Sequence, residues 1–247
     1  MSKVTEYFDH VRSIADRVQR EQLGHIETAG ALMAEGIAEG HRLFAFGASH
    51  AGILAEELFY RTGGLALMNP IFSPILMLST RPVTLTSQME RLEGHGQALI
   101  RESAVASGDV VLIHSVSGRN AVSIDAALAS KERGARVVAL TSMEYSRNVT
   151  ARHSSGKNLY AHADVVIDNC GDFEDSSMKL EGLEQKIAPT STAVGAMIVN
   201  GIVISVVENL IKRGIEPPVF HSANVDGGDA FNARLFERYR DRIFYMR

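Results

Sequence analysis

The stretch VVLIHSVSGRNAVSIDAALASK, residues 110–131, decides the fold. It opens with an apolar run of the kind found in strands that are buried on both faces of a parallel sheet. Small polar residues follow at Ser115-Val116-Ser117-Gly118, and a segment with helical periodicity comes directly after them. A buried strand, a polar turn and a helix are together the repeating unit of α/β proteins.

The same alternation extends outward in both directions along the chain. Apolar runs predict strands in 42–50, in the first part of 65–78, and in 135–142 and 164–170. Apolar spacings of three and four predict two helices in 4–38 with a break near Gly24, and further helices in 51–62, 87–106, 123–135, 188–212 and 230–244. We therefore expect an α/β fold, a three-layer αβα sandwich with a mainly parallel sheet, of the flavodoxin-like or Rossmann-like type.

No internal repeat or linker divides the chain, so we expect a single domain over residues 1–247. N-terminal helices would occupy 1–38, the αβα core 39–212, and a C-terminal tail 213–247. The segment 188–212 is very apolar, but it is interrupted by glycine and flanked by polar residues. This pattern favours a helix buried between subunits or against the sheet over a membrane span.

Composition excludes several classes of function. A net charge of −4 and a pI near 6.1 argue against a general nucleic-acid or membrane-surface binder. The N-terminal residues are mixed and charged, without the apolar core of a secretion signal, so we expect a cytoplasmic protein. The single cysteine, Cys170, excludes an internal disulfide and a thiolate metal cluster.

Three predicted junctions between a strand or loop and a helix are rich in small polar residues: 47–50, 115–120 and 189–192. Hydroxyls and free backbone N–H groups at such junctions form donor sites for anions, and a phosphate fits this chemistry. Helix capping is the simpler explanation for any one of them. Neither a Walker loop nor the GxGxxG spacing of dinucleotide-binding proteins is present, which disfavours ATP and NAD.

The motifs FGASHAG, HSVSGRN and APTST resemble the sugar isomerase (SIS) domain of phosphosugar isomerases and phosphosugar-binding proteins. The resemblance covers about residues 30–212, and GASHAGILAEELFYRTGGLA resembles single-domain members of that family. It implies a sugar-phosphate ligand, no cofactor and a homodimer or homotetramer. With Asn120 from the second junction, the expected phosphate-binding residues are Ser49, Ser115, Ser117, Gly118, Asn120, Thr190, Ser191 and Thr192.

Aldose–ketose isomerisation moves a proton between adjacent carbons and needs a carboxylate base. The segment 55–58 is similar to the one that carries the glutamate base of sedoheptulose-7-phosphate isomerases, which makes Glu57 the first candidate, with Glu56 beside it. Glu93 is the second, from its similarity in position to an acidic segment of N-acetylmuramic acid 6-phosphate etherases. His50 follows the first phosphate serine and is a further candidate. The alternative is that these side chains have no catalytic role. They would then be exposed to solvent or paired with nearby charges, as Glu90 would be with Arg91.

Three other functions stay open at this point. The protein could be an etherase or other lyase, a non-catalytic phosphosugar sensor, or a structural module with a relic pocket. The residues before the SIS-like core are too few and too weakly basic for a complete DNA-binding domain, so we expect no nucleic-acid partner and no membrane partner. No HExxH or other tight ligand pair is present, so no metal site is expected. Arg119 could add positive charge near a bound phosphate.

Overall fold

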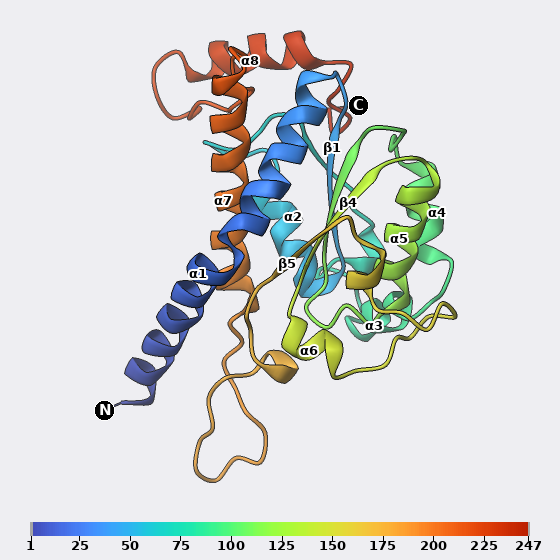
Figure 1. Ribbon diagram of the computed structural model, residues 1–247, viewed down its shortest axis with the longest axis vertical. Coiled ribbons are helices and arrows are strands. Elements are labelled where there is room, and N and C mark those ends of the chain that lie inside the picture. Colours follow the sequence, from blue (N-terminus) through green and yellow to red (C-terminus); the bar gives the residue numbers. More distant parts are fainter. Residues whose placement is uncertain (1, 247) are drawn as a thin grey trace.

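The computed structural model describes residues 2–246, and their strands form one parallel sheet in the order β2-β1-β3-β4-β5 (Figure 1). The strands are β1 (Leu43–Gly47), β2 (Met68–Pro70), β3 (Val110–His114), β4 (Arg136–Thr141) and β5 (Val165–Asp168). Parallel pairing requires crossover connections, which the helices between the strands supply. The predicted α/β class, with a parallel sheet and a helical N-terminus, is confirmed.

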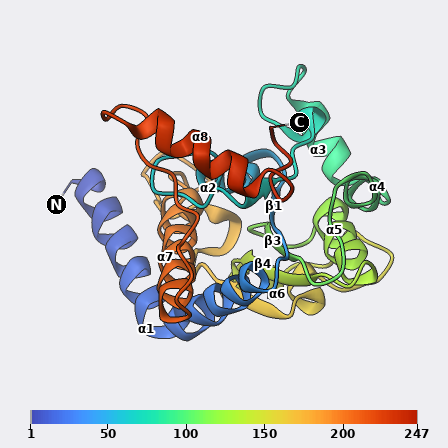
Figure 2. The same ribbon diagram turned by 90° about the horizontal axis from the view of Figure 1, so that it is seen from above.

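Helices cover both faces of this sheet (Figures 1 and 2). The helices α1, α2 and α7 lie on one face, and α4 and α5 lie on the other with α3 near them. Their bounds are α1 (Lys3–Ala38), α2 (Ile53–Leu58), α3 (Thr84–Glu90), α4 (His95–Glu102), α5 (Ala121–Glu132), α6 (Met143–Arg147), α7 (Ser191–Lys212) and α8 (Gly228–Tyr239). The result is a three-layer αβα sandwich.

Side-chain alternation along the central strand explains why both faces are apolar. In β3, Val110 and Leu112 belong to the core that includes α1 and α7, whereas Val111 and Ile113 belong to the core against α5. Successive side chains of a strand point to opposite faces, so a strand covered on both sides must be apolar throughout. This is the continuous apolar pattern that opens the stretch 110–131.

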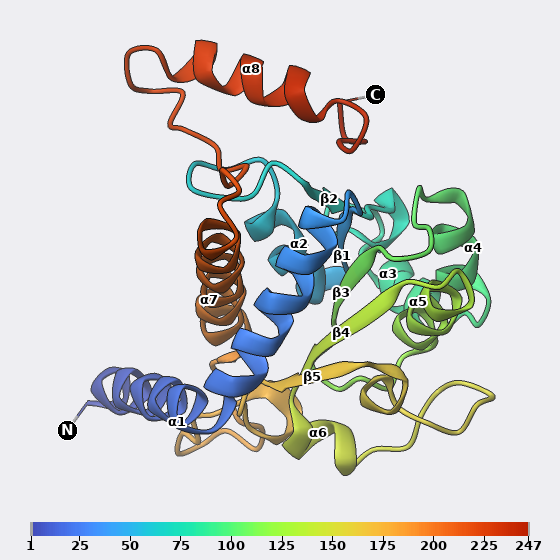
Figure 3. The same cartoon turned by 45° about the horizontal axis from the view of Figure 1, so that its top comes forward.

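The N-terminal segment is one helix and not the two that the sequence pattern predicts. Helix α1 runs unbroken from Lys3 to Ala38, with Gly24 inside it, and changes direction along its length (Figures 2 and 3). Packing against α7 outweighs the weak helix propensity of a single glycine. At Gly30 a Cβ atom would lie 2.3 Å from Ser205 Oγ on α7, so glycine permits the close approach of the two helices.

Helix α7 is long and apolar enough, by length and composition, to cross a membrane, and half of its apolar window is buried inside the protein. Its buried side chains, Val194, Ile198 and Ile202 among them, pack with those of α1 and α2. In Figure 1, α7 lies beside α1 at one flank of the sheet. It begins at Ser191, three residues later than the predicted start at 188.

Two other predicted helices differ from the observed ones. The segment expected as one helix over 87–106 forms α3 and α4, separated at Gly94, whose φ of 91° lies outside the helical region. The helix expected over 230–244 spans Gly228–Tyr239 and is followed by turns. In both places a local backbone preference, which apolar periodicity does not report, sets the boundary.

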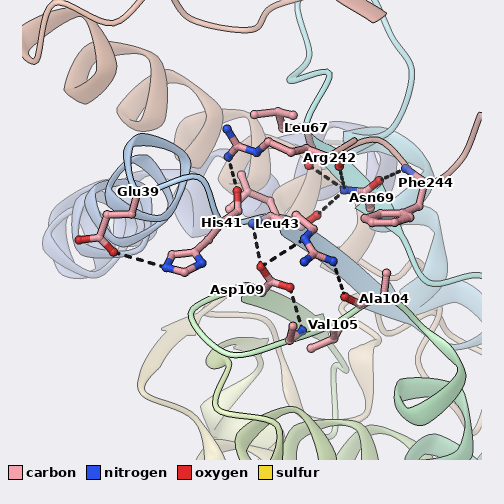
Figure 4. A network of polar contacts seen from close by, with 12 residues as sticks. Glu39, His41, Leu43, Leu67, Asn69, Ala104, Val105, Asp109, Arg242 and Phe244 are labelled. Atoms are coloured by element: carbon pink, nitrogen blue, oxygen red, sulfur yellow. Dashed lines mark hydrogen bonds and ion pairs between the residues drawn. The ribbon is translucent and has the colours of Figure 1, made fainter. Parts of the chain in front are cut away.

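A network of polar contacts lies at the amino-terminal ends of the strands (Figure 4). The buried Asp109 carboxylate accepts hydrogen bonds from the backbone N–H groups of Arg42 and Ala106, both at 2.8 Å. Asn69 donates to the Arg242 carbonyl at 3.0 Å and accepts from the Phe244 N–H at 2.8 Å. The segment after α8 is thereby joined to the edge strand β2.

Candidate functional site

A cavity of about 220 Å³ lies at the carboxyl ends of β1 and β3, where α/β proteins commonly place their ligands. It brings together residues from the first two predicted junctions and from α3 and α6, two more distant segments. Its lining residues are Ala48, Ser49, His50, Ala51, Glu90, Ser115, Val116, Ser117, Asn120, Ser123 and Tyr145. Of the predicted site residues, Ser49, His50, Ser115, Ser117 and Asn120 therefore share one cavity.

The strand-to-helix turn after β3 supplies unused hydrogen-bond donors. Within residues 2–246, the hydroxyls of Ser115 and Ser117 have no hydrogen-bond partner, and neither do the backbone N–H groups of Val116 and Ser117. Hydroxyls and amides that line a cavity without a protein acceptor can bind an anion or a sugar hydroxyl. The turn is thus chemically suited to a phosphate.

Gly118 follows these donors and plays a different part. Its φ is 61°, and a Cβ at this position would lie 2.7 Å from Ser146 Oγ and 3.2 Å from Thr141 Oγ1. The residue is absent from the cavity lining. Glycine at 118 therefore shapes the turn and permits its close packing on α6, and its expected part in phosphate binding stays a prediction.

Ser49 has a strained backbone at the mouth of the cavity. Its φ of 50° lies in the left-handed region, which serine adopts at a cost on the order of 1–3 kcal/mol. The side chain donates a hydrogen bond to the Glu90 carboxylate, which also lines the cavity. Backbone strain of this kind concentrates at functional sites because the surrounding structure has to maintain it.

Glu90, the last residue of α3, places a carboxylate inside the cavity. Besides the Ser49 hydroxyl, it accepts a hydrogen bond from Asn120 Nδ2 at 2.6 Å. From the sequence, Glu90 is expected only to pair with Arg91 and nearby charges. No local pattern could have revealed it, because 41 positions separate it from Ser49 and 30 from Asn120.

Glu57 does not line this cavity. Its carboxylate accepts hydrogen bonds from Arg61, one turn further along the chain, and from Asn200 Nδ2 on α7 at 2.9 Å. Glu56, its neighbour, is exposed. Neither glutamate is part of the cavity lining.

Glu93 also lies outside the cavity, and its contacts hold a loop. The carboxylate accepts from the Ser154 N–H at 2.9 Å and from the Ser154 hydroxyl, and these two hydrogen bonds lower the pKa of Glu93. His153, next to Ser154, lies 3.1 Å from the buried carboxylate of Asp125. Together these contacts fix the 152–155 segment against α5.

The third predicted junction lies at the start of α7, and Asp175 engages part of its donors. Asp175 accepts from the N–H groups of Thr190 and Ser191, at 3.4 and 3.1 Å, and from Ser191 Oγ at 2.5 Å. Thr190, Ser191 and Thr192 are not part of the cavity lining. A role of this junction in phosphate binding stays a prediction.

The two histidines near the first two junctions differ in accessibility. His50 is exposed at the cavity. His114 is buried at the end of β3, and its Nδ1 atom lies 3.0 Å from the Ala51 carbonyl oxygen, which makes Nδ1 the protonated nitrogen. Burial lowers the pKa of His114 below its ordinary value. Among residues 2–246, no three His, Cys, Asp or Glu side chains group closely enough to hold a metal ion.

Comparison with known proteins shows the family to which the chain belongs and the folds that it resembles. The model of the SIS domain matches residues 6–142. A UPF0309 protein of Shouchella clausii is 50% identical over 246 residues, covering 100% of both chains, and one of Oceanobacillus iheyensis is 48% identical with the same coverage.

Among solved structures, the phosphoheptose isomerase of Neisseria gonorrhoeae matches with a TM-score of 0.54 and 17% identity, over 83% of this chain and 96% of that one. A phosphoheptose isomerase from Francisella tularensis gives a TM-score of 0.52 and 14% identity, over 83% and 98% of the two chains. At such low identity the likeness concerns the fold. The family match, covering more than half of the chain, shows that the protein belongs to the SIS-domain family.

Proposed function

We propose that this protein binds a sugar phosphate in the cavity at the carboxyl ends of β1 and β3. The observation that carries the proposal is the free donor set of the turn after β3, namely the hydroxyls of Ser115 and Ser117 and the amides beside them. Membership of the SIS-domain family and the phosphoheptose isomerase names of two relatives of similar fold support the same ligand class.

We further propose that the bound sugar phosphate is isomerised between aldose and ketose. A base removes the proton from one of the two carbons C1 and C2, and the resulting enediol takes a proton back on the other, so no electrons are exchanged with a cofactor. The position of Glu90 within the cavity favours it as the base over Glu57, which is held by Arg61 and Asn200. His50, which also lines the cavity, is the proposed group for transferring a proton between the oxygens on C1 and C2.

The etherase alternative depends on Glu93, whose carboxylate is engaged by Ser154 outside the cavity. The isomerase proposal is therefore the better supported of the two. A sensor would bind the same ligand without turning it over, and an activity assay separates these outcomes.

We also propose a homo-oligomer with contacts along α1 and α7. Between these helices lies an apolar groove that includes Val18, Ile26 and Ile198, and the large apolar side chains of Leu23 and Ile204 beside it are exposed. Exposed apolar area of this kind favours association. The single-domain organisation and a cytoplasmic location stay predictions.

A thermal-shift screen against sugar phosphates and the matching free sugars tests the binding proposal, because a ligand of the folded state raises the melting temperature. We expect shifts with phosphorylated sugars only. Ser117→Asp should abolish them, since it adds a negative charge at the turn. Ser87→Asp, the same change at an exposed position of α3, is the matched control and should leave them intact. Equal shifts in Ser117→Asp and wild type would refute the phosphate assignment.

A further inference from the structure

Three arginines from separate segments lie within electrostatic range of one another beside the cavity, although none of them is part of its lining. Arg91 follows α3, Arg119 precedes α5, and Arg152 lies in the segment after α6. We call them the arginine rim. Two of them are joined through the backbone, because Arg152 donates its N–H to the Arg119 carbonyl at 2.7 Å.

Arg152 connects the rim to the cavity. Its Nη1 donates to Asn120 Oδ1 at 3.1 Å, while the amide nitrogen of Asn120 donates to Glu90. Its guanidinium also lies within electrostatic range of Tyr145 and Glu90, and both of these residues line the cavity. Arg152 is therefore placed at the cavity mouth beside Asn120.

The arginine rim makes no ion pair within residues 2–246, because no carboxylate lies within 4.0 Å of the guanidinium of Arg91, Arg119 or Arg152. The Glu90 carboxylate compensates the charge of Arg152 only from a longer distance. Partial burial lowers the pKa of Arg152, and the charges of Arg119 and Arg91 lower it further. Three like charges held close together repel one another in the unliganded protein.

The rim is held in place by contacts that do not use up its donors. Arg119 Nε donates to the Thr150 carbonyl at 3.0 Å and its Nη2 donates to Thr150 Oγ1 at 3.4 Å, which leaves the Nη1 donors of its guanidinium free. Glu93 and Ser154 fix the chain two residues beyond Arg152. A guanidinium with free donors binds carboxylate or phosphate oxygens through paired hydrogen bonds.

We propose that the arginine rim binds a second anionic group, a carboxylate or a further phosphate, on the same sugar phosphate whose first phosphate occupies the serine turn. This inference rests on the proposed function. It narrows the ligand class to sugar phosphates with two anionic groups, and it gives a role to the loop contacts of Glu93.

Two matched pairs of ligands test the rim by isothermal titration calorimetry at low ionic strength. One pair is 6-phosphogluconate with sorbitol 6-phosphate, which differ by a carboxylate. The other is fructose 1,6-bisphosphate with fructose 6-phosphate, which differ by a phosphate. We expect the more highly charged member of at least one pair to bind roughly tenfold more tightly, and the pair that shows the difference identifies the group.

The double variant Arg91→Gln/Arg152→Gln should remove this advantage, so that the two members of the pair bind with similar affinity. Arg101→Gln/Arg136→Gln is the charge-matched control, since both exposed arginines lie toward the edge where the strands begin. It should retain the advantage, and circular dichroism checks the folding of each variant.

Equal affinities within both pairs, or an advantage that persists in Arg91→Gln/Arg152→Gln, would refute the binding of a second anionic group by the arginine rim. Either result would leave the proposal of sugar-phosphate binding intact. Absence of binding by all four ligands, sorbitol 6-phosphate and fructose 6-phosphate included, would overturn the proposed function and this inference with it. The two failures are therefore distinguishable.

Discussion

Asn120 Nδ2 donates a hydrogen bond of 2.6 Å to Glu90 Oε2, and this contact joins the serine turn to the end of α3. The cavity therefore contains two kinds of group. The turn supplies free hydroxyls and amides, and Glu90 supplies a carboxylate held by Asn120 and Ser49. Anion-binding donors near a fixed carboxylate are what enediol chemistry on a phosphorylated sugar requires.

We expect Glu90→Gln to lower isomerase turnover by roughly 10²- to 10⁴-fold, because the amide cannot accept the proton. Affinity for inorganic phosphate should be equal or higher, since a negative charge leaves the cavity. Steady-state kinetics and calorimetry measure the two effects. Glu93→Gln, outside the cavity, is the comparison and should retain far more activity. If Glu57→Gln abolishes turnover and Glu90→Gln does not, the base is Glu57.

Two glycines of α1 should respond in opposite directions to alanine. At Gly24 no atom lies within 4 Å of the position of an added Cβ, so Gly24→Ala should stabilise the protein by about 0.5–1 kcal/mol through helix propensity. At Gly30 the added Cβ would lie 2.3 Å from Ser205 Oγ, so Gly30→Ala should destabilise it by about 1–3 kcal/mol. Urea unfolding measures both changes. A stabilised Gly30→Ala would contradict the close packing of α1 on α7.

The buried His114 should make stability depend on pH. Because burial lowers its pKa in the folded state, the unfolded chain takes up a proton as the pH falls through about 6.5, and the folded chain does not. The contribution of His114 is therefore complete above that pH and is lost progressively below it. His114→Asn places an amide nitrogen near the position of Nδ1 and cannot titrate, so its unfolding free energy should decline less between pH 7.5 and 5.5. Parallel pH profiles would refute this assignment.

The carboxylate of Asp109 should be important for stability at the opposite edge of the sheet. Asp109→Ala would leave the N–H groups of Arg42 and Ala106 without their acceptor in a buried place, at a cost of about 2–4 kcal/mol. Chemical denaturation measures the loss. Asp226→Ala, at an exposed position before α8, is the comparison and should cost much less. Equal stability of Asp109→Ala and wild type would show that the polar network in Figure 4 does not stabilise the fold through Asp109.

The fold could be predicted because each of its signals is local. The apolar run 110–114 with the polar turn after it predicts a buried strand and a helix start, and the structure has both in β3 and α5. The continuity of α1 through Gly24 could not be predicted in this way, because contacts with α7, far along the chain, decide it.

The same distinction applies to the site. Serines in the turn were identified because the strand-to-helix junction contains them, and Ser115 and Ser117 do line the cavity. Glu90 and Arg152 reach it only through the folding of remote segments, and nothing in their neighbouring residues signals it. Conversely, the donors at Thr190 and Ser191 have a suitable pattern, but Asp175 satisfies them.

The hydrogen bonds between Asn69 and the segment 242–244 have a consequence for synthesis of the chain on the ribosome. Asn69 at β2 makes its hydrogen bonds with Arg242 and Phe244, which lie 173 and 175 positions further along the chain, so these bonds form only when the distant segments meet. Contacts so distant in sequence form late, because closing long loops is entropically costly. Until residues 242–244 emerge, the nascent sheet presents an incompletely covered edge, the kind of surface to which other unfinished chains adhere. Rapid completion of synthesis, or transient shielding by a chaperone, should therefore raise the yield of native protein.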